Sequence, residues 1–461
     1  MISEQNKKFL IDSEKKSFDL EHRRIVNFNI AKYDVAVING KKQYKNLDLA
    51  KKRAAHIKHR VVNDLDKYLV EFEFNFTKRG GKVIWAQDTK EAMTEIIAIL
   101  RKYDVKDLVK SKSMITEEIE FNHVAKENNI NSLETDLGEY IVQLADDRPY
   151  HIITPVMHKS KEDIAELFNQ KFGTKKDSTP TEIANFVRHL LREKFVNADA
   201  GVTGGNFLIA DIGAVLVTEN EGNGVMSVAF PKVHIAIVGI EKLIPSIMDL
   251  DLFLPLLATH GTGQNITAYN SILSGPRQDK EVDGPTDMYV VLLDNRRSDI
   301  LALKEQRRVL SCIRCGACLN GCPIYKNVGG HTYETTYSGP IGAVISPHLL
   351  GVQEFKHLSF ASSLCGKCTE VCPVNIPLHE LLLENRNFAV KHVKPLFFEK
   401  ATMYGWKKVM LNRWMMDTGS ASLKNKALRV VFSKLWGSRR ALPIVSTKNF
   451  HQMWKERKGA Q

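Results

Sequence analysis

Hydrophobic residues change their spacing along the chain, and the changes divide it into regions. From residue 1 to about 70 they recur every three or four positions among many charges, as in residues 47–62, which predicts helices. From about residue 80, short apolar runs alternate with amphipathic stretches. Such alternation is typical of an α/β domain with a largely parallel sheet.

The elements of this α/β region can be placed by residue. Strands are predicted at 82–86, 108–114, 150–156, 207–209, 214–217, 234–239 and 288–293. Helices are predicted at 88–103, 116–128 and 161–172, with Thr116 as an N-cap. Two glycine-rich stretches, 199–206 and 218–224, are interpreted either as turns or as loops whose backbone approaches an anion. Turns are favoured because neither stretch has a dinucleotide-binding or Walker pattern.

Beyond the α/β region the pattern becomes helical again. Residues 300–310 and 378–390 are predicted helices, and residues 325–361 between them carry glycine and proline pairs that predict a loop-rich insert. The chain therefore divides into a helical N-terminal segment (1–70), an α/β domain (71–299), an α-helical domain (300–390) and a C-terminal segment (391–461).

Positive charge is concentrated in residues 391–461, here called the tail. The chain has a net charge of +12, but the tail holds sixteen Lys and Arg against three acids, while the preceding chain holds 49 basic and 50 acidic residues. Met403, Trp406, Met410 and Trp414 form one apolar helical stripe in it. This stripe is interpreted either as core or as a face that docks on an acidic partner or a membrane surface.

The sequence also indicates the compartment. The N-terminus is charged and lacks the apolar core of a signal peptide. No run reaches the ~18 uninterrupted apolar residues of a membrane span. We therefore expect a cytoplasmic protein, with peripheral attachment to a membrane left open.

All seven cysteines lie in two short runs. The first, Cys312, Cys315, Cys318 and Cys322 followed by proline, has the C-x2-C-x2-C-x3-C-P spacing of bacterial [4Fe–4S] ferredoxins. The second holds Cys365, Cys368 and Cys372, again followed by proline. Zinc sites use four ligands in pairs, and a disulfide framework needs an oxidising compartment and usually an even count, so both fit less well.

In two-cluster ferredoxins the fourth cysteine of each run binds the other cluster. The same crossing here gives a first thiol set, Cys312, Cys315, Cys318 and Cys372, and a second thiol set, Cys322, Cys365 and Cys368. Ser362 stands where the second set would need a fourth cysteine. The second cluster is therefore either a [4Fe–4S] cube with one non-cysteine ligand or a three-iron cluster.

Charged residues also gather after predicted strands. Lys110 and Lys112 follow one strand, where they could neutralise an anion or face water. Glu134, Asp136 and Glu139 lie close together, either as a polar site with candidate acids or bases or as the acidic first turn of a helix.

Several longer motifs carry a resemblance to a known family. Residues 110–114 with Glu117 and Glu118, and residues 134–143, 219–223, 239–242 and 274–277, resemble the lactate-utilization (LUD) domain. Followed by the first cysteine run, they are similar to the lactate utilization protein B family, from about Asn46 to the C-terminus. One departure is Arg296 in Asp294-Asn-Arg-Arg297, where the family commonly has glycine.

The resemblance implies a LUD domain of the CoA-transferase and ribose-isomerase type, two [4Fe–4S] clusters on the seven cysteines, and a role in a three-protein system that oxidises L-lactate to pyruvate. The leading hypothesis is a non-catalytic electron-transfer subunit of this L-lactate dehydrogenase complex, whose partners are the other subunits. The alternatives are a LUD-domain enzyme acting on an anionic metabolite and an iron–sulfur regulatory sensor. Binding to nucleic acid is not expected, because no recognisable reader motif is present.

Overall fold

The computed structural model describes residues 3–393, 397–436 and 441–459. Its contacts divide the chain into a large unit, residues 2–393, and a small unit, residues 394–461. Each is described by itself. Within the described residues no helix has both the length and the hydropathy to cross a membrane.

The first seventy residues are helical, as predicted. They form α1 (Glu4–Ser17), α2 (Leu20–Gly40), η1 (Lys41–Gln43) and α3 (Leu47–Asn63), and α4 (Leu65–Lys78) follows directly. The side chains of Ser3, Asp19 and Asn46 cap the first three α-helices by accepting backbone N–H bonds. Phe9 of α1 packs on Tyr333 at a ring distance of 6.1 Å, so these helices share a core with the cysteine-bearing region.

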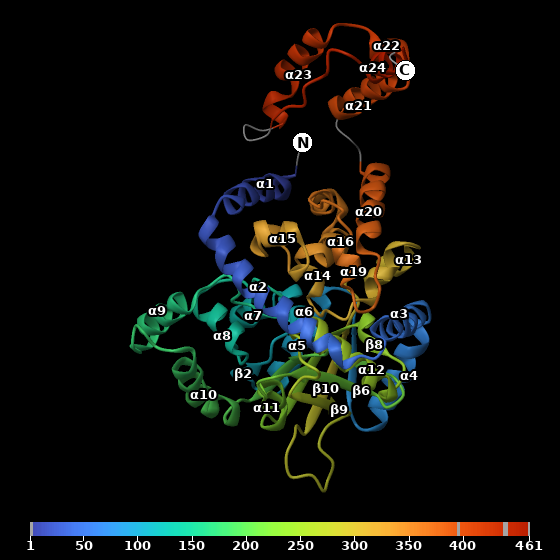
Figure 1. Cartoon of the computed structure of the whole chain (residues 1–461). Helices are drawn as coiled ribbons and strands as arrows, with labels where there is room; N and C mark the ends of the chain where they lie inside the picture. Colours follow the sequence, from blue (N-terminus) through green and yellow to red (C-terminus); the bar gives the residue numbers. More distant parts are fainter. Residues whose placement is uncertain (1–2, 394–396, 437–440, 460–461) are drawn as a thin grey trace. The chain divides into compact units, whose positions relative to one another are not determined.

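A six-stranded sheet organises the α/β region (Figure 1). All its strands are parallel, in the order β1 (Lys82–Ala86), β10 (Asp287–Leu293), β7 (Val233–Gly239), β4 (Ala200–Gly204), β2 (Asp107–Lys110) and β3 (Asn131–Glu134). Every residue of β7 is buried, which explains its uninterrupted apolar sequence. The predicted α/β class with a largely parallel sheet is confirmed.

Helices and a second sheet cover the two faces. The second sheet has the order β8 (Leu243–Ile244), β5 (Phe207–Ile209), β6 (Ala214–Glu219) and β9 (Tyr269–Leu273). Ile235 and Ile237 of β7 face α5 (Thr89–Lys102), α6 (Met114–Glu118) and α7 (Phe121–Glu127). Ala236 and Val238 face α4 and the second sheet, because neighbouring strand residues point to opposite sides. The helices of this region are α5 (Thr89–Lys102), α6 (Met114–Glu118), α7 (Phe121–Glu127), α8 (Leu137–Leu144), α9 (Lys161–Phe172), α10 (Pro180–Val196), α11 (Asn223–Ala229), η2 (Ile240–Lys242), η3 (Ile247–Asp249), α12 (Leu250–Thr262) and α13 (Arg297–Ala302).

Several predicted elements are wrong in detail. Residues 150–156 form turns, with the Tyr150 N–H bonded to the Pro155 carbonyl, and their apolar side chains enter the cysteine-bearing core instead of a sheet. The helix predicted at 116–128 is two helices, α6 and α7, broken at Glu120, whose φ is 53°. Ser113, not Thr116, is the N-cap of α6. The stretch 199–206, interpreted as a turn, contains β4.

The regular elements described in the cysteine-bearing region are all helices. It holds η4 (Gln306–Ser311), α14 (Ala317–Asn320), α15 (Pro323–Val328), η5 (His331–Tyr333), α16 (Gly339–Leu350), α17 (Val352–Phe355), α18 (His357–Phe360), α19 (Lys367–Glu370) and α20 (Leu378–His392). The predicted loop-rich insert is wrong, since most of residues 325–361 are helical, and α16 in this stretch is almost entirely buried. Its apolar residues surround the helix, which is typical of a helix at the centre of a core.

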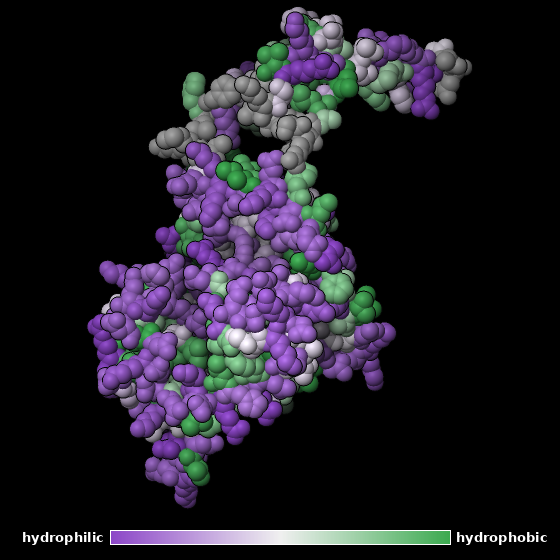
Figure 2. Space-filling model, turned by 90° about the vertical axis from the view of Figure 1, so that its left-hand side faces the viewer, coloured by the Kyte–Doolittle hydropathy of each residue, from purple (hydrophilic) through white to green (hydrophobic). Residues whose placement is uncertain are grey.

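The small unit consists of α21 (Phe397–Met410), α22 (Arg413–Asp417), α23 (Ala421–Trp436) and α24 (Phe450–Gly459). None of its described side chains is buried. Trp406 and Trp414 of the predicted stripe are 57% and 75% exposed. Figure 2 shows hydrophobic and hydrophilic residues mixed on this unit, while the visible face of the large unit is mostly hydrophilic. The core interpretation of the stripe has no support in this unit.

Candidate iron–sulfur centres

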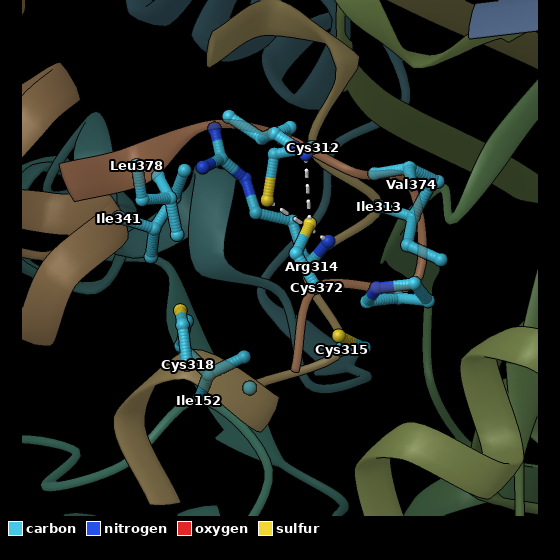
Figure 3. Close-up of a pocket in the computed structure, with 13 residues that line it drawn as sticks. Ile152, Cys312, Ile313, Arg314, Cys315, Cys318, Ile341, Cys372, Val374 and Leu378 are labelled. Atoms are coloured by element: carbon cyan, nitrogen blue, oxygen red, sulfur yellow. Dashed lines mark hydrogen bonds between the residues drawn. The ribbon is translucent and has the colours of Figure 1, made fainter. Parts of the chain in front are cut away.

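The first thiol set lies around a single pocket. Cys312, Cys315, Cys318 and Cys372 line it together with apolar side chains that include Ile152, Ile313, Ile341 and Val374. Figure 3 shows the four sulfur atoms directed toward the same space, although Cys372 comes from a segment more than fifty residues further along the chain. The structure thus brings together the four residues that the crossed pattern groups.

The two cysteine runs share one backbone conformation. Arg314 and Leu364, each just before a cysteine, have φ of 61° and 55°, and Gly316 and Gly366, each just after it, have φ of 75° and 79°. A four-residue helix follows in each run, α14 in the first and α19 in the second. The left-handed conformation favours glycine, which explains the Cys-Gly pair in both runs. Superposing the runs in register places Ser362 on Cys312.

Ser362 also makes the same hydrogen bond as its counterpart. The Arg314 N–H donates to Cys312 Sγ at 3.4 Å, and the Leu364 N–H donates to Ser362 Oγ at 3.1 Å. Backbone N–H groups of Tyr325 and Ile376 donate to the sulfurs of Cys322 and Cys372 at 3.5 and 3.3 Å. Such bonds to thiolate sulfur stabilise the charged form and tune the potential of an iron–sulfur cluster.

The second thiol set is more exposed to solvent than the first. Burial, followed by the charges of Cys322 and Cys365, raises the pKa of Cys368 to about 11, so the three thiols interact electrostatically. Cys368 is buried, Cys322 is half-buried and Cys365 is exposed. The second site is therefore nearer to solvent than the first.

The first site fits an iron–sulfur cluster. Burial, followed by the charge of Cys372, raises the pKa of Cys315, and burial also raises those of Cys318 and Cys372. Buried thiols of this kind are inert as nucleophiles but become thiolates when a metal replaces the proton. Apolar walls, converging thiols and N–H donors to sulfur together suit a cluster shielded from water.

A buried ionic network joins the first site to the α/β region. Arg297 Nη1 and Nη2 each donate to Glu118 at 2.8 Å, and its Nε donates to Glu241 at 2.6 Å. Glu241 also pairs with Arg314 at 3.3 Å. The Arg314 guanidinium lies 4.2 Å from the ring centre of Tyr337. The Tyr337 hydroxyl donates to Glu118, so the contacts form a closed ring of side chains. These four charged side chains are at most 7% exposed.

The network fixes the charge of its members. Burial alone would raise the pKa of Glu241, but the guanidinium groups of Arg297 and Arg314 lower it to about 2. Arg296, the residue that departs from the family pattern, takes the left-handed conformation with φ of 67°, and the adjacent Arg297 supplies the two-carboxylate contact. Sequence reasoning missed this network because its members come from four distant segments.

Two lysines, the buried Lys58 and the half-buried Lys242, interact with Cys312. Lys58 Nζ donates to the carbonyls of Glu241 and Leu243 at 2.8 and 2.9 Å. Burial lowers the pKa of Lys58 to about 7 and that of Lys242 to about 8, and both interact electrostatically with Cys312. Positive groups here oppose the negative charge of four thiolates.

The polar residues at the ends of β2 and β3, and those that follow β3, mostly have structural roles. Lys110, fully buried, pairs with Glu134 at 2.8 Å. Asp136 is the N-cap of α8 and accepts the Glu139 N–H at 3.0 Å, which supports the helix-start interpretation of these acids. Glu139 is buried on α8, and burial raises its pKa to about 8.

The raised pKa of Glu139 predicts a pH dependence. The unfolded side chain loses its proton above about pH 4.5, but the folded one keeps it up to about pH 8. The folded state therefore binds more protons in this window, and stability falls as the pH rises, by at most about 1.4 kcal/mol per pH unit. Glu139→Gln should flatten this decline in denaturant unfolding at pH 5, 6.5 and 8. Glu95→Gln, at an exposed position, should leave it unchanged; an unchanged slope in Glu139→Gln would show that Glu139 titrates normally.

Ser362 can be tested as a fourth ligand of the second site. If its oxygen binds iron, Ser362→Ala should change the spectrum of the second cluster and speed its loss of iron in air, whereas a serine that only caps the turn should leave both unchanged. Ser362→Cys should complete a four-thiolate site and lower its potential, because a further negative charge disfavours reduction. Electron paramagnetic resonance under a controlled potential measures both effects. Ser363→Ala, at the exposed neighbouring position, is the matched control.

Comparison with known proteins agrees with the two-part architecture. The LUD domain family matches residues 69–293, and the 4Fe-4S dicluster domain family matches residues 308–376. A solved DUF162 family protein from Deinococcus radiodurans is 13% identical, with a TM-score of 0.28 over 50% of this chain and 98% of that one, a likeness too weak to carry an argument.

Relatives of known name match most of the chain. Lactate utilization protein B from Bacillus velezensis is 47% identical over 352 residues, which cover 76% of this chain and 74% of the relative. The proteins of the same name from Bacillus cytotoxicus and Bacillus thuringiensis are 41% and 42% identical, each over 87% of both chains. Since the pocket lined by four cysteines, the parallel α/β sheet and these long matches agree, this chain belongs to the lactate utilization protein B family.

Proposed function

We propose that this chain is an electron-transfer subunit of a system that oxidises L-lactate to pyruvate. The proposal rests on four cysteines that converge on one pocket. It also rests on three further cysteines, in whose run Ser362 takes the position that Cys312 has in the first run. The first thiol set would hold one [4Fe–4S] cluster and the second thiol set the other. The clusters would supply one-electron transfer. The lactate utilization proteins B named above supply the metabolic context.

The surrounding residues suit such a role. Basic side chains around the first set, namely Arg314, Lys58 and Lys242, would offset cluster charge and favour the reduced state. Exposure of Cys365 places the second set near the surface, where electrons can pass to or from another protein. Apolar side chains around the first pocket keep water away from it.

Lactate-dependent reduction tests the function. The anaerobic protein should remain oxidised with L-lactate alone and become reduced when the partner subunits are added, as followed by absorbance near 400 nm and electron paramagnetic resonance. Conversion of lactate by the isolated chain would contradict a carrier role and favour an enzyme. No reduction with the complete set of subunits would also contradict the proposal.

The tail is proposed to bind the partner subunits through its positive charge. Its exposed aromatic and methionine side chains lie among lysines and arginines, a surface suited to an acidic partner. Lys407→Glu/Lys408→Glu on α21 should weaken assembly. Association of the unaltered chain should also fall as the Debye length shrinks from ~10 Å at 0.1 M salt to ~3 Å at 1 M.

Co-purification with the partner subunits measures this effect. The control is Lys175→Glu/Lys176→Glu, which makes the same charge change at exposed positions of the large unit. Equal assembly by the two double variants would show that the charge of α21 does not bind the partner.

A further inference from the structure

Outside the cysteine sites, two histidines and a carboxylate converge from three segments. Asp147 follows α8, His158 precedes α9 and His331 begins η5 in the cysteine-bearing region. His158 Nε2 lies 3.0 Å from one carboxylate oxygen of Asp147, and His331 Nε2 lies 3.8 Å from the other. One ligand atom can be chosen from each of the three side chains so that all three atoms lie within 4.8 Å of one another.

We propose that Asp147, His158 and His331 bind a divalent transition-metal ion of the zinc class. Zinc bonds to imidazole and carboxylate at about 2.0–2.2 Å, so ligand atoms in a tetrahedral site lie about 3.3–3.5 Å apart. The distances from Asp147 to His158 Nε2 and to His331 Nε2, 3.0 and 3.8 Å, fall just below and just above that range. Calcium and magnesium prefer all-oxygen sites, so two imidazoles disfavour them.

The imidazoles are held in place by packing. The Tyr150 ring stacks on His158 at 4.7 Å and meets His331 edge-on at 4.9 Å. Tyr150 is itself fixed, because its hydroxyl bonds to His22 at 2.9 Å and its carbonyl accepts from Tyr325 at 2.8 Å. Ligands restrained in this way lose little conformational entropy when an ion binds.

Accessibility also suits an ion. The side chains of His158, Asp147 and His331 are 13%, 27% and 34% exposed, which leaves one side open for entry and for a water ligand. An imidazole binds a metal ion through a nitrogen that carries no proton.

A bound ion would have to replace some of the contacts that Asp147 and His331 already make. Asp147 accepts the Arg148 N–H at 2.8 Å and pairs with Lys159 at 3.3 Å, while His331 Nε2 contacts the Arg148 carbonyl at 2.7 Å. His158 Nδ1 has no hydrogen-bond partner among the described residues. Binding through Nε2 places the proton of each neutral ring on Nδ1 and displaces the Lys159 ammonium. Removing that ammonium should therefore tighten binding.

The site would connect the α/β region, which holds Asp147 and His158, to the cysteine-bearing region, which holds His331. A Cβ on Gly330, the residue before His331, would lie 1.9 Å from the Tyr150 carbonyl oxygen, so the two segments are already in close contact. His331 lies nine residues after Cys322. A bound ion would stabilise this junction next to the second thiol set.

Zinc binding tests the proposal in the intact chain. Protein purified anaerobically is matched for iron content, dialysed against zinc chloride and analysed for zinc and iron by mass spectrometry. We expect one zinc per chain beyond any background, with binding weakened at least tenfold in His331→Ala and tightened in Lys159→Met. His189→Ala, an exposed histidine on α10, should bind as the unaltered chain does.

Thermal unfolding gives an independent readout. Zinc should raise the unfolding temperature of the unaltered chain and of His189→Ala, because an ion that binds only the folded state stabilises it. It should not raise that of His331→Ala. Equal zinc content and equal thermal shifts in the unaltered chain and in His331→Ala would overturn the proposal, since the zinc would then be bound elsewhere, for instance by cysteines that have lost iron.

Discussion

Cys372→Ser is expected to destroy the cluster held by Cys312, Cys315 and Cys318. Cys372 lies with these three around one pocket, although it belongs to the other cysteine run. A serine oxygen is a poorer iron ligand than a thiolate, so the first cluster should be lost or degraded while the second set keeps all its ligands. Iron per chain should fall from about eight to about four atoms.

Cys322→Ser is the matched control, because it makes the same change at the equivalent position of the first run. It should damage the cluster of Cys365 and Cys368 and spare the first. Electron paramagnetic resonance of the reduced variants distinguishes the two signals. A Cys322→Ser variant that keeps the second signal and loses the first would show that each run binds its own cluster, against the crossed assignment.

Arg297→Met is expected to cause a large loss of stability. It would leave Glu118 and Glu241 buried, with only Arg314 as a cationic partner inside the network. Breaking a buried ion pair typically costs about 3–5 kcal/mol, because an uncompensated charge remains away from water. Denaturant unfolding under anaerobic conditions measures the change.

The exposed pair of Arg24 and Glu21 provides the control. Both side chains are about two-thirds exposed, so Arg24→Met should change the free energy of unfolding far less than Arg297→Met does. Adding Glu118→Gln to Arg297→Met should recover part of the loss, since it removes one unpaired charge. A loss in Arg297→Met no greater than in Arg24→Met would contradict the role assigned to the network.

The sequence predicted best those features that depend on local spacing. β7 and β10 were found because both faces of a central parallel strand are buried, and α9 and α20 because their apolar residues have helical spacing. The cysteine grouping follows from spacing as well, and its crossed ligation stays a prediction, as do the domain boundaries at 70, 299 and 390.

Features that depend on tertiary contacts could not be found in this way. Residues 150–156 are apolar like a strand, but Tyr150 and Ile152 pack beside Cys315 in the cysteine-bearing core. The Arg297 network joins residues up to 219 positions apart, as in the Tyr337–Glu118 bond. Asp147, His158 and His331 are likewise unremarkable until the fold brings them together.

Iron and sulfide analysis combined with electron paramagnetic resonance of the anaerobic protein tests the central claim most directly. Two [4Fe–4S] clusters predict about eight iron and eight sulfide per chain, with two reduced-state signals that interact magnetically. About seven irons with a three-iron signal that added ferrous iron cannot convert would contradict the assignment of the second site. About four irons with a single signal would contradict the two-cluster claim itself.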